Sequence, residues 1–184
     1  VNTLSFVDGH VHGDTTDAPG LLKVLQELPE RCRSRVQLLG DGGAARAAAW
    51  ALRAWGADEV VVCARSGGEA LAERFGFAAS KLAPVAGAQL IVSTLPATEA
   101  LAHSIVTEWA EQGARPVLCD VAYGEPLSLA ATYARAAGWP AFDGRQMLVE
   151  QAALSLARWL ELPAERLRPA MVAALPFDSN SGLS

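Results

Sequence analysis

Residues 36–46 read Val-Gln-Leu-Leu-Gly-Asp-Gly-Gly-Ala-Ala-Arg, a short apolar run that leads through three glycines into an alanine-rich segment ending at Trp55. The pattern predicts a strand, a tight turn and a helix, with Gly40, Gly42 and Ala45 as the fixed positions of a Gly-x-Gly-x-x-Ala motif. In such a turn the glycines allow a sharp bend and the close approach of a pyrophosphate, and the alanine lets helix and strand pack closely. The free N–H groups and the dipole of the helix N-terminus favour the phosphates. The stretch therefore predicts a dinucleotide-binding turn, with an ordinary strand-to-helix connection as the alternative.

Strands and helices are predicted to alternate along the rest of the chain. Runs such as 89–93 and 116–119 lack polar alternation, which is typical of parallel strands covered on both faces. We predict a doubly wound parallel α/β sheet of the Rossmann type with helices on both faces. The predicted strands are 36–39, 59–64, 88–93, 115–120 and 140–142, and the predicted helices are 44–55, 69–75, 99–112, 127–137, 144–160 and 164–174.

The start of the chain has a different pattern. Residues 1–7 and 10–14 are predicted to form a hairpin around Asp8-Gly9, and Asp17-Ala-Pro-Gly20 opens a helical stretch over 21–28. Residues 29–35 are predicted to be a polar connection into the glycine turn. Because the chain begins with Val1 inside the hairpin, we expect a further segment upstream.

Composition narrows the classes of partner. A chain of 184 residues with 51% hydrophobic and 19% charged residues can bury the core of one large domain. A net charge of -5 without a basic cluster argues against nucleic acid and anionic membranes. No apolar run approaches the ~20 residues of a membrane span, and no signal peptide is present, so we predict a cytoplasmic protein.

Cysteine and histidine positions argue against a metal site. Cys32, Cys63 and Cys119 are odd in number and widely spaced, which favours reduced thiols over disulfides. His10 and His12 share one strand face but lack a third ligand at a suitable spacing, so exposed hairpin histidines are favoured over zinc.

The preferred cofactor depends on the end of the second strand of the sheet. An acidic residue there would hydrogen-bond both ribose hydroxyls and favour NAD. This chain has Cys63-Ala64-Arg65-Ser66 instead, and the planar guanidinium of Arg65 can pair with a 2′-phosphate. We therefore predict NADP, with NAD as the second choice. Glu69 stands where a second cation would be expected, and a solvated Arg65 at the strand end is the alternative.

Six segments of the chain carry a family resemblance. They are Val1–Leu4, Gly13–Gly20, Gly40–Arg46, Ala64–Ser66, Asp120–Tyr123 with Glu125–Leu127, and Asp143–Ala152. In this order and spacing they resemble shikimate dehydrogenase over nearly the whole chain. The resemblance implies an NADP-dependent oxidoreductase that reduces 3-dehydroshikimate to shikimate in aromatic amino acid biosynthesis. It also implies that the family's N-terminal substrate lobe, with paired serines and a catalytic lysine, would precede Val1.

The same resemblance implies a substrate site. Asn2 and Asp17 would contact the substrate hydroxyls, with Asp17 as the catalytic partner of the lysine outside this chain. Gln151 would reach the substrate from the cofactor domain, and Tyr123 would line the cleft. From the residues alone, a cap of the helix that starts near Ala18 is the favoured role for Asp17, and the resemblance reverses that preference. Thr15 stands where the family usually has asparagine, which leaves the substrate open between shikimate and the related acid quinate.

The resemblance also implies a set of cofactor contacts. Thr94 would lie near the nicotinamide ribose, and Val121, Gly144 and Met147 would contact the nicotinamide, although Met147 as a core residue and Tyr123 as a strand-end aromatic are ordinary alternatives. Asp41 departs from the family's small apolar residue, and its carboxylate would repel a pyrophosphate. The full predicted set for the cofactor is Gly40, Gly42, Gly43, Ala44, Arg65, Ser66, Thr94, Val121, Gly144 and Met147.

These predictions divide the chain into four parts. Residues 1–29 form a hairpin and helix of the substrate-side or interdomain region, 30–143 the dinucleotide-binding domain, 144–175 the C-terminal return helices and 176–184 a flexible tail. A small-molecule substrate is the predicted partner. A non-catalytic nucleotide-binding module is the rival hypothesis from another functional class.

Overall fold

The computed structural model describes residues 1–113, 115–125 and 127–175, so the predicted tail lies outside the described residues. The strands are β1 (Thr3–Val7), β2 (His10–Asp14), β3 (Val36–Leu39), β4 (Val60–Ala64), β5 (Ala78–Lys81), β6 (Leu90–Ser93), β7 (Val117–Asp120) and β8 (Ala141–Phe142). The helices are α1 (Asp17–Gln26), α2 (Gly43–Trp55), α3 (Glu69–Phe75), α4 (Glu99–Glu111), α5 (Leu129–Ala136), α6 (Arg145–Leu160) and α7 (Ala164–Ala174), and Glu30–Arg33 is a short 3-10 helix.

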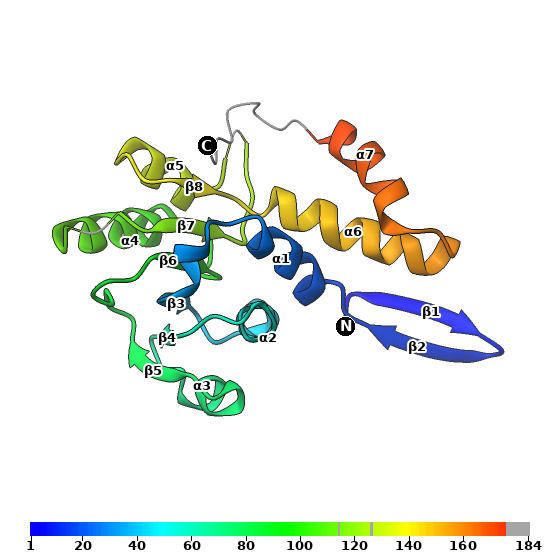
Figure 1. Ribbon diagram of the computed structural model, residues 1–184, viewed down its shortest axis with the longest axis horizontal. Helices are drawn as coiled ribbons and strands as arrows, with labels where there is room; N and C mark the ends of the chain where they lie inside the picture. The colour runs from blue at the N-terminus through cyan, green and yellow to red at the C-terminus, as the bar shows by residue number, and fades with distance from the viewer. Residues whose placement is uncertain (114, 126, 176–184) are drawn as a thin grey trace.

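Six strands form one parallel sheet in the order β5-β4-β3-β6-β7-β8 (Figure 1). Counted within the sheet, this is the order 3-2-1-4-5-6 of doubly wound dinucleotide-binding folds. The predicted fold class is therefore confirmed.

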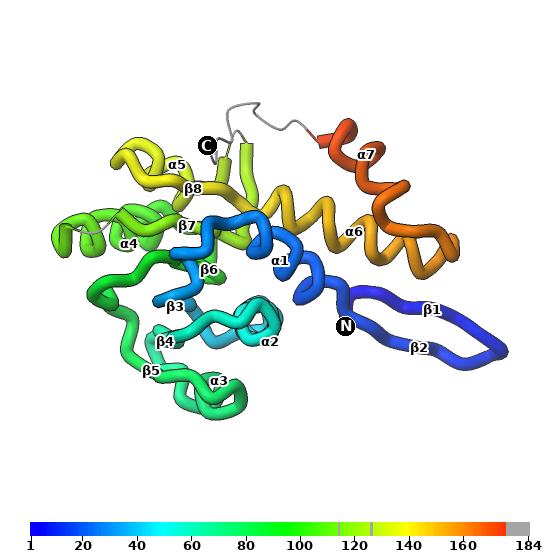
Figure 2. The backbone as a smooth tube through the Cα atoms, in the orientation of Figure 1, coloured from blue at the N-terminus to red at the C-terminus, as the bar shows by residue number. Residues whose placement is uncertain are grey.

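Helices cover both faces of the sheet. Neighbouring residues of each strand point to opposite sides, so one strand contributes to the core on both faces. On β3, Val36 and Leu38 pack with α1, α2 and α3 in one hydrophobic cluster. Leu39 packs with α4 and α5 in a second cluster on the other face. Figure 2 shows α1 between α2 and α6, and α1 contacts both of these helices.

Two predictions about local structure are wrong. The edge strand β5 was not expected, because its exposed Ala-Ala-Ser-Lys sequence lacks an apolar run and only pairing with β4 makes it a strand. Helix α1 starts at Asp17 rather than Leu21, because Pro19 sits in the first turn, where a helix needs no N–H donor. The other predicted strands and helices agree with the observed ones to within two residues at each end.

The hairpin β1–β2 extends away from the sheet (Figure 1). Its turn has positive φ at Asp8 (48°) and Gly9 (76°), as two-residue hairpin turns require. Trp159 on α6 donates a hydrogen bond to the carbonyl of Leu4 at 2.9 Å, which ties the hairpin to this helix. None of the described helices combines the length and hydropathy that a membrane-spanning helix requires.

Candidate functional site

The topological switch of the sheet lies between β3 and β6. The helix that follows β3 packs on one face and the helix that follows β6 on the other. In doubly wound folds, ligands bind outside the carboxyl ends of the strands at such a point. Thr94 joins the two strand ends, since its N–H and its Oγ1 both donate to the carbonyl of Leu39, at 2.9 and 2.7 Å. Gly40 has φ 109°, and a Cβ there would collide with Thr94. Both predicted residues thus lie at the switch point.

The glycine turn leaves the N-terminus of α2 open. Gly42 is the N-cap, no side chain caps the helix, and the first turn carries no acidic residue. Apart from adjacent residues and the backbone of α2 itself, no described atom lies within 4 Å of the place where a Cβ would stand on Gly42 or Gly43. Room and free N–H donors are what a pyrophosphate requires, so the residues present fit a dinucleotide.

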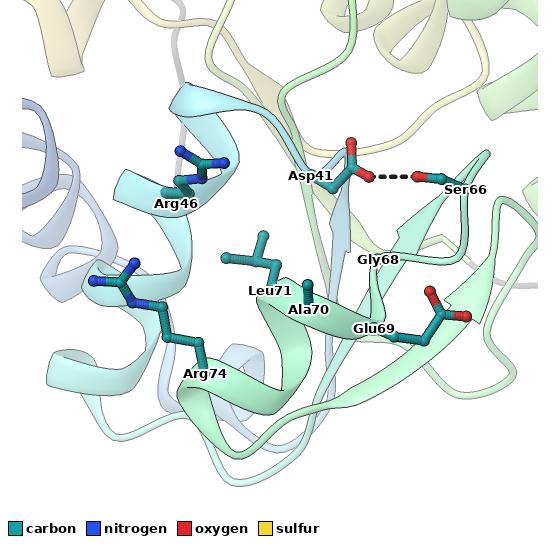
Figure 3. A pocket seen from close by; sticks show the side chains of 8 residues that line it. All are labelled: Asp41, Arg46, Ser66, Gly68, Glu69, Ala70, Leu71 and Arg74. Atoms are coloured by element: carbon teal, nitrogen blue, oxygen red, sulfur yellow. Dashed lines mark hydrogen bonds between the residues drawn. The ribbon is translucent and has the colours of Figure 1, made fainter.

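A cavity of about 530 Å³ adjoins this turn (Figure 3). The hydroxyl of Ser66 donates to Asp41 Oδ2 at 2.5 Å, which links the turn after β3 to the turn after β4. Arg65 is exposed and is not among the described residues that line the cavity. The lining residues are Asp41, Arg46, Ser66, Gly68, Glu69, Ala70, Leu71 and Arg74, of which sequence reasoning had not selected Arg46 or Arg74.

Val121 and Gly144 meet at the same edge of the sheet. The N–H of Val121 donates to the carbonyl of Ser93 at 2.9 Å, and the N–H of Gly144 donates to the carbonyl of Ala122 at 2.8 Å. A Cβ on Gly144 would collide with the Val121 carbonyl, so only glycine permits this approach. Met147 packs against the core cluster on the α2 side, as its ordinary alternative suggested.

Two buried carboxylates organise the loop after β7. Asp143 Oδ2 accepts from the Ser128 N–H at 3.1 Å, and its Oδ1 accepts from Arg145 Nε at 2.9 Å. Burial raises the pKa of Asp120, against hydrogen bonds from Ser128, Ala122 and Ser93 that lower it. Asp120 therefore binds a proton more tightly in the folded protein than in the unfolded chain.

The three cysteines are free and buried, and all lie in the described part of the chain. Burial raises the pKa of Cys119 strongly, with further contributions from Asp120 and Asp143, and raises those of Cys32 and Cys63. Low thiolate content makes such side chains poor nucleophiles. Among the described residues, no three His, Cys, Asp or Glu side chains gather in a way that could hold a metal ion.

Asn2 and Asp17 are in direct contact. Asn2 Nδ2 donates to Asp17 Oδ1 at 2.7 Å and to Thr16 Oγ1 at 3.0 Å, while Asn2 Oδ1 accepts from the Thr16 N–H at 2.9 Å. The N-cap of α1 is Thr16, and Asp17 lies in the first turn of the helix. The capping alternative for Asp17 is therefore wrong, and its carboxylate is held instead by the side chain that the same resemblance selected.

Gln151 lies at the junction of α1 and α6. A Cβ on Gly20 would stand 2.9 Å from the Gln151 nitrogen and 3.2 Å from its Cα, so glycine lets the two helices approach closely. Asp17 lies one turn before Gly20 on α1. The fold thus brings Asn2, Asp17 and Gln151 to one region, whereas Tyr123 is 61% exposed after β7 and hydrogen-bonds to none of the described residues.

Ser155 joins the three segments of this region. Its Oγ lies 2.7 Å from Thr3 Oγ1 and 3.0 Å from Thr16 Oγ1, and it donates to the Gln151 carbonyl at 3.0 Å. Sequence reasoning missed this residue. The available signal was its position four residues after Gln151, because residues so spaced share one face of a helix.

The sheet order, the switch point and the open glycine turn define a Rossmann-type α/β protein. No family model matches the chain. A curated relative, the shikimate dehydrogenase (NADP(+)) of Oleidesulfovibrio alaskensis, is 35% identical over 185 residues, which cover 95% of this chain and 66% of the relative. This chain belongs to the shikimate dehydrogenase family, as the six segments predicted.

Solved structures agree with this assignment. The shikimate dehydrogenase of Mycobacterium tuberculosis superposes with a TM-score of 0.76 at 30% identity, covering 95% of this chain and 67% of that protein. The shikimate 5-dehydrogenase of Thermus thermophilus, solved with NADP(H) and shikimate, has a TM-score of 0.71 at 31% identity, covering 94% and 67%. The chain spans less than two thirds of the length of the curated relative.

Proposed function

We propose that this chain supplies the NADP-binding domain and one wall of the substrate cleft of an enzyme that reduces 3-dehydroshikimate to shikimate. The observation that supports this most directly is the hydrogen bond between Asn2 and Asp17, at the start of helix α1, which packs against α2 of the glycine turn and against α6, the helix of Gln151. In this proposal residues 1–29 belong to the substrate side, 30–143 bind the cofactor and 144–175 return to the cleft.

The cofactor contacts follow from the switch point. The open N-terminus of α2, with Gly40, Gly42, Gly43 and Ala44, binds the pyrophosphate. Arg65 and Ser66 bind the adenosine end. At the other end Thr94, Val121, Gly144 and Met147 position the nicotinamide. NADPH supplies the hydride when it is bound, and the protein supplies orientation and charge.

The substrate is bound and oriented by Asn2, Asp17 and Gln151. The amide groups of Asn2 and Gln151 orient the hydroxyls, and Asp17 accepts a hydrogen bond from the hydroxyl whose proton is exchanged. In this proposal the lysine paired with Asp17 comes from outside these 184 residues, because Lys23 pairs with Glu165 at 3.5 Å and Lys81 lies in edge strand β5. Tyr123 completes the wall of the cleft.

Two alternatives remain within this proposal. Thr15 stands where the family usually has asparagine, so a dehydrogenase for quinate or a related hydroxy acid is the nearest one. A non-catalytic nucleotide-binding module is the second, because the carboxylates of Asp41 and Glu69 in the lining of the cavity would weaken the binding of a dinucleotide cofactor. A cytoplasmic location and a small-molecule partner belong to the same proposal.

The decisive test joins the chain to the substrate lobe of the Oleidesulfovibrio alaskensis relative, placed ahead of Val1. We expect NADPH-dependent reduction of 3-dehydroshikimate, and a loss of about 100-fold or more in turnover for Asp17→Asn, because a positioned acid–base group contributes about that much. Asp8→Asn, in the exposed turn of the hairpin, is the matched control and should keep full turnover.

Cofactor binding by the unmodified 184-residue chain shows whether the domain is folded and competent. Near-normal turnover of Asp17→Asn would remove Asp17 from the reaction. A chain that bound neither NADPH nor NADH in calorimetric titration would reject the cofactor assignment itself. If the chain bound NADPH but the fusion neither reduced 3-dehydroshikimate nor oxidised quinate, the non-catalytic module would be favoured.

A further inference from the structure

The cavity beside the glycine turn has two arginines on one side. Arg46 projects from α2 and Arg74 from α3, and these two helices pack against each other. Figure 3 shows both guanidinium groups on the side of the cavity nearer α2, with Leu71 between them and the Asp41–Ser66 pair. Two positive charges therefore line the same cavity.

The guanidinium groups of both arginines lack a partner among the described residues. Arg46 and Arg74 are exposed, and within the described part of the chain neither side chain makes a hydrogen bond or an ion pair. By contrast, Arg35 pairs with Glu59 at 2.8 Å. Two arginines that face one cavity without a carboxylate partner are suited to a ligand that carries negative charge.

The two acidic residues of the cavity do not neutralise them. The carboxylate of Asp41 accepts the hydroxyl of Ser66 at 2.5 Å. The carboxylate of Glu69 lies against Gly67, and Figure 3 shows it directed away from Arg46 and Arg74. Positive and negative charge are thus separated within one cavity.

The predicted site for the 2′-phosphate lacks a second cation. Glu69 stands where that cation would be expected to help Arg65, so Arg65 is the single cation that the β4–α3 turn supplies. We propose that Arg46 and Arg74 supply the missing cations and bind the 2′-phosphate of the dinucleotide from the α2–α3 side of the cavity. This inference rests on the proposed NADP site and adds the residues that decide between NADP and NAD.

The test uses adenosine nucleotides that differ only in the phosphate. The unmodified chain and the variants Arg46→Ala, Arg74→Ala and the double variant are titrated calorimetrically with 2′,5′-ADP and with 5′-AMP. We expect each single variant to weaken 2′,5′-ADP binding about 10-fold and the double variant about 50-fold or more, because Arg–phosphate contacts are charge-assisted. Binding of 5′-AMP should change less than about 2-fold, since it lacks the 2′-phosphate.

The matched control is Arg53→Ala, which removes an exposed arginine from the last turn of α2 and should leave both affinities unchanged. Arg74→Lys should restore only part of the affinity, because lysine lacks the planar fork of arginine. Inorganic phosphate as a competitor distinguishes a general anion site from one that needs the nucleoside. If phosphate displaced 2′,5′-ADP and 5′-AMP equally well, the assignment to the 2′-phosphate would be overturned.

The remaining outcomes separate this inference from the proposed function. If the double variant kept its preference for 2′,5′-ADP over 5′-AMP, the inference would be wrong while NADP binding stood, and Arg65→Ala would then be expected to abolish that preference. If the unmodified chain bound neither nucleotide nor NADPH, both the inference and the proposed cofactor would be rejected.

Discussion

Asp41 is predicted to weaken cofactor binding, and its removal should strengthen it. The residue lies between the two glycines of the turn, and its hydrogen bond to Ser66 holds the carboxylate in the lining of the cavity. Turning the carboxylate away would break this bond at a cost of about 1 kcal/mol. A bound pyrophosphate would therefore meet a nearby like charge.

The expected gain follows from Coulomb's law. Two unit charges about 5 Å apart repel by about 0.8 kcal/mol in water-like surroundings, and a pyrophosphate carries more than one charge. After partial screening a net cost of about 0.7–1.4 kcal/mol remains, which corresponds to about 3- to 10-fold in affinity. We expect Asp41→Ala and Asp41→Asn to tighten NADPH binding by this factor at low salt.

Calorimetric titration at two salt concentrations tests whether charge repulsion causes the weaker binding. The Debye length is about 30 Å at 0.01 M salt and about 3 Å at 1 M, so the gain should nearly vanish at high salt. Asp41→Asn keeps an acceptor for Ser66, which separates the effect of charge from that of the hydrogen bond. Asp58→Asn removes the same charge before the amino end of β4, at the opposite edge of the sheet, and should change nothing. An Asp41→Asn variant that bound NADPH no better at 0.01 M salt would refute the reasoning.

Three further predictions concern stability. Gly20→Ala would place a Cβ 2.9 Å from the Gln151 nitrogen. Urea denaturation should show that the free energy of unfolding falls by about 1 kcal/mol, because overpacking outweighs the gain in helix propensity. An unchanged midpoint would mean that α1 and α6 separate freely. Because burial raises the pKa of Asp120, the folded state binds its proton more tightly than the unfolded state, and stability is lost as pH rises above the ordinary value of 3.8. Asp120→Asn should therefore raise the melting temperature at about pH 7 but not at about pH 3, and a lower melting temperature at both would contradict this. Trp109→Phe removes the indole N–H that donates to buried Gln37 Oε1 at 2.5 Å and should cost about 1–3 kcal/mol in the same denaturation assay, whereas a neutral result would show that the Val85 N–H satisfies Gln37 alone.

Local sequence determined most of the fold. The apolar run 36–39, the glycines after it and the alanine-rich helix are predictable because strand period, turn chemistry and helix propensity all act within a few residues. The same holds for the hairpin turn at Asp8-Gly9. The six family segments likewise predicted Asn2, Asp17 and Gln151 as site residues, because a motif preserves residue types in order along the chain.

Tertiary structure decided the contacts that join distant segments. Strand β5 exists because β4 offers a free edge, which no pattern within residues 78–81 encodes. Ser155 meets Thr3 and Thr16 across more than a hundred residues of sequence, and Arg46 meets the cavity that Arg74 also lines only because α2 and α3 pack together. Sequence patterns specify which face a side chain takes on its own element, whereas the packing of elements determines what that face meets, and packing depends on every element of the chain at once.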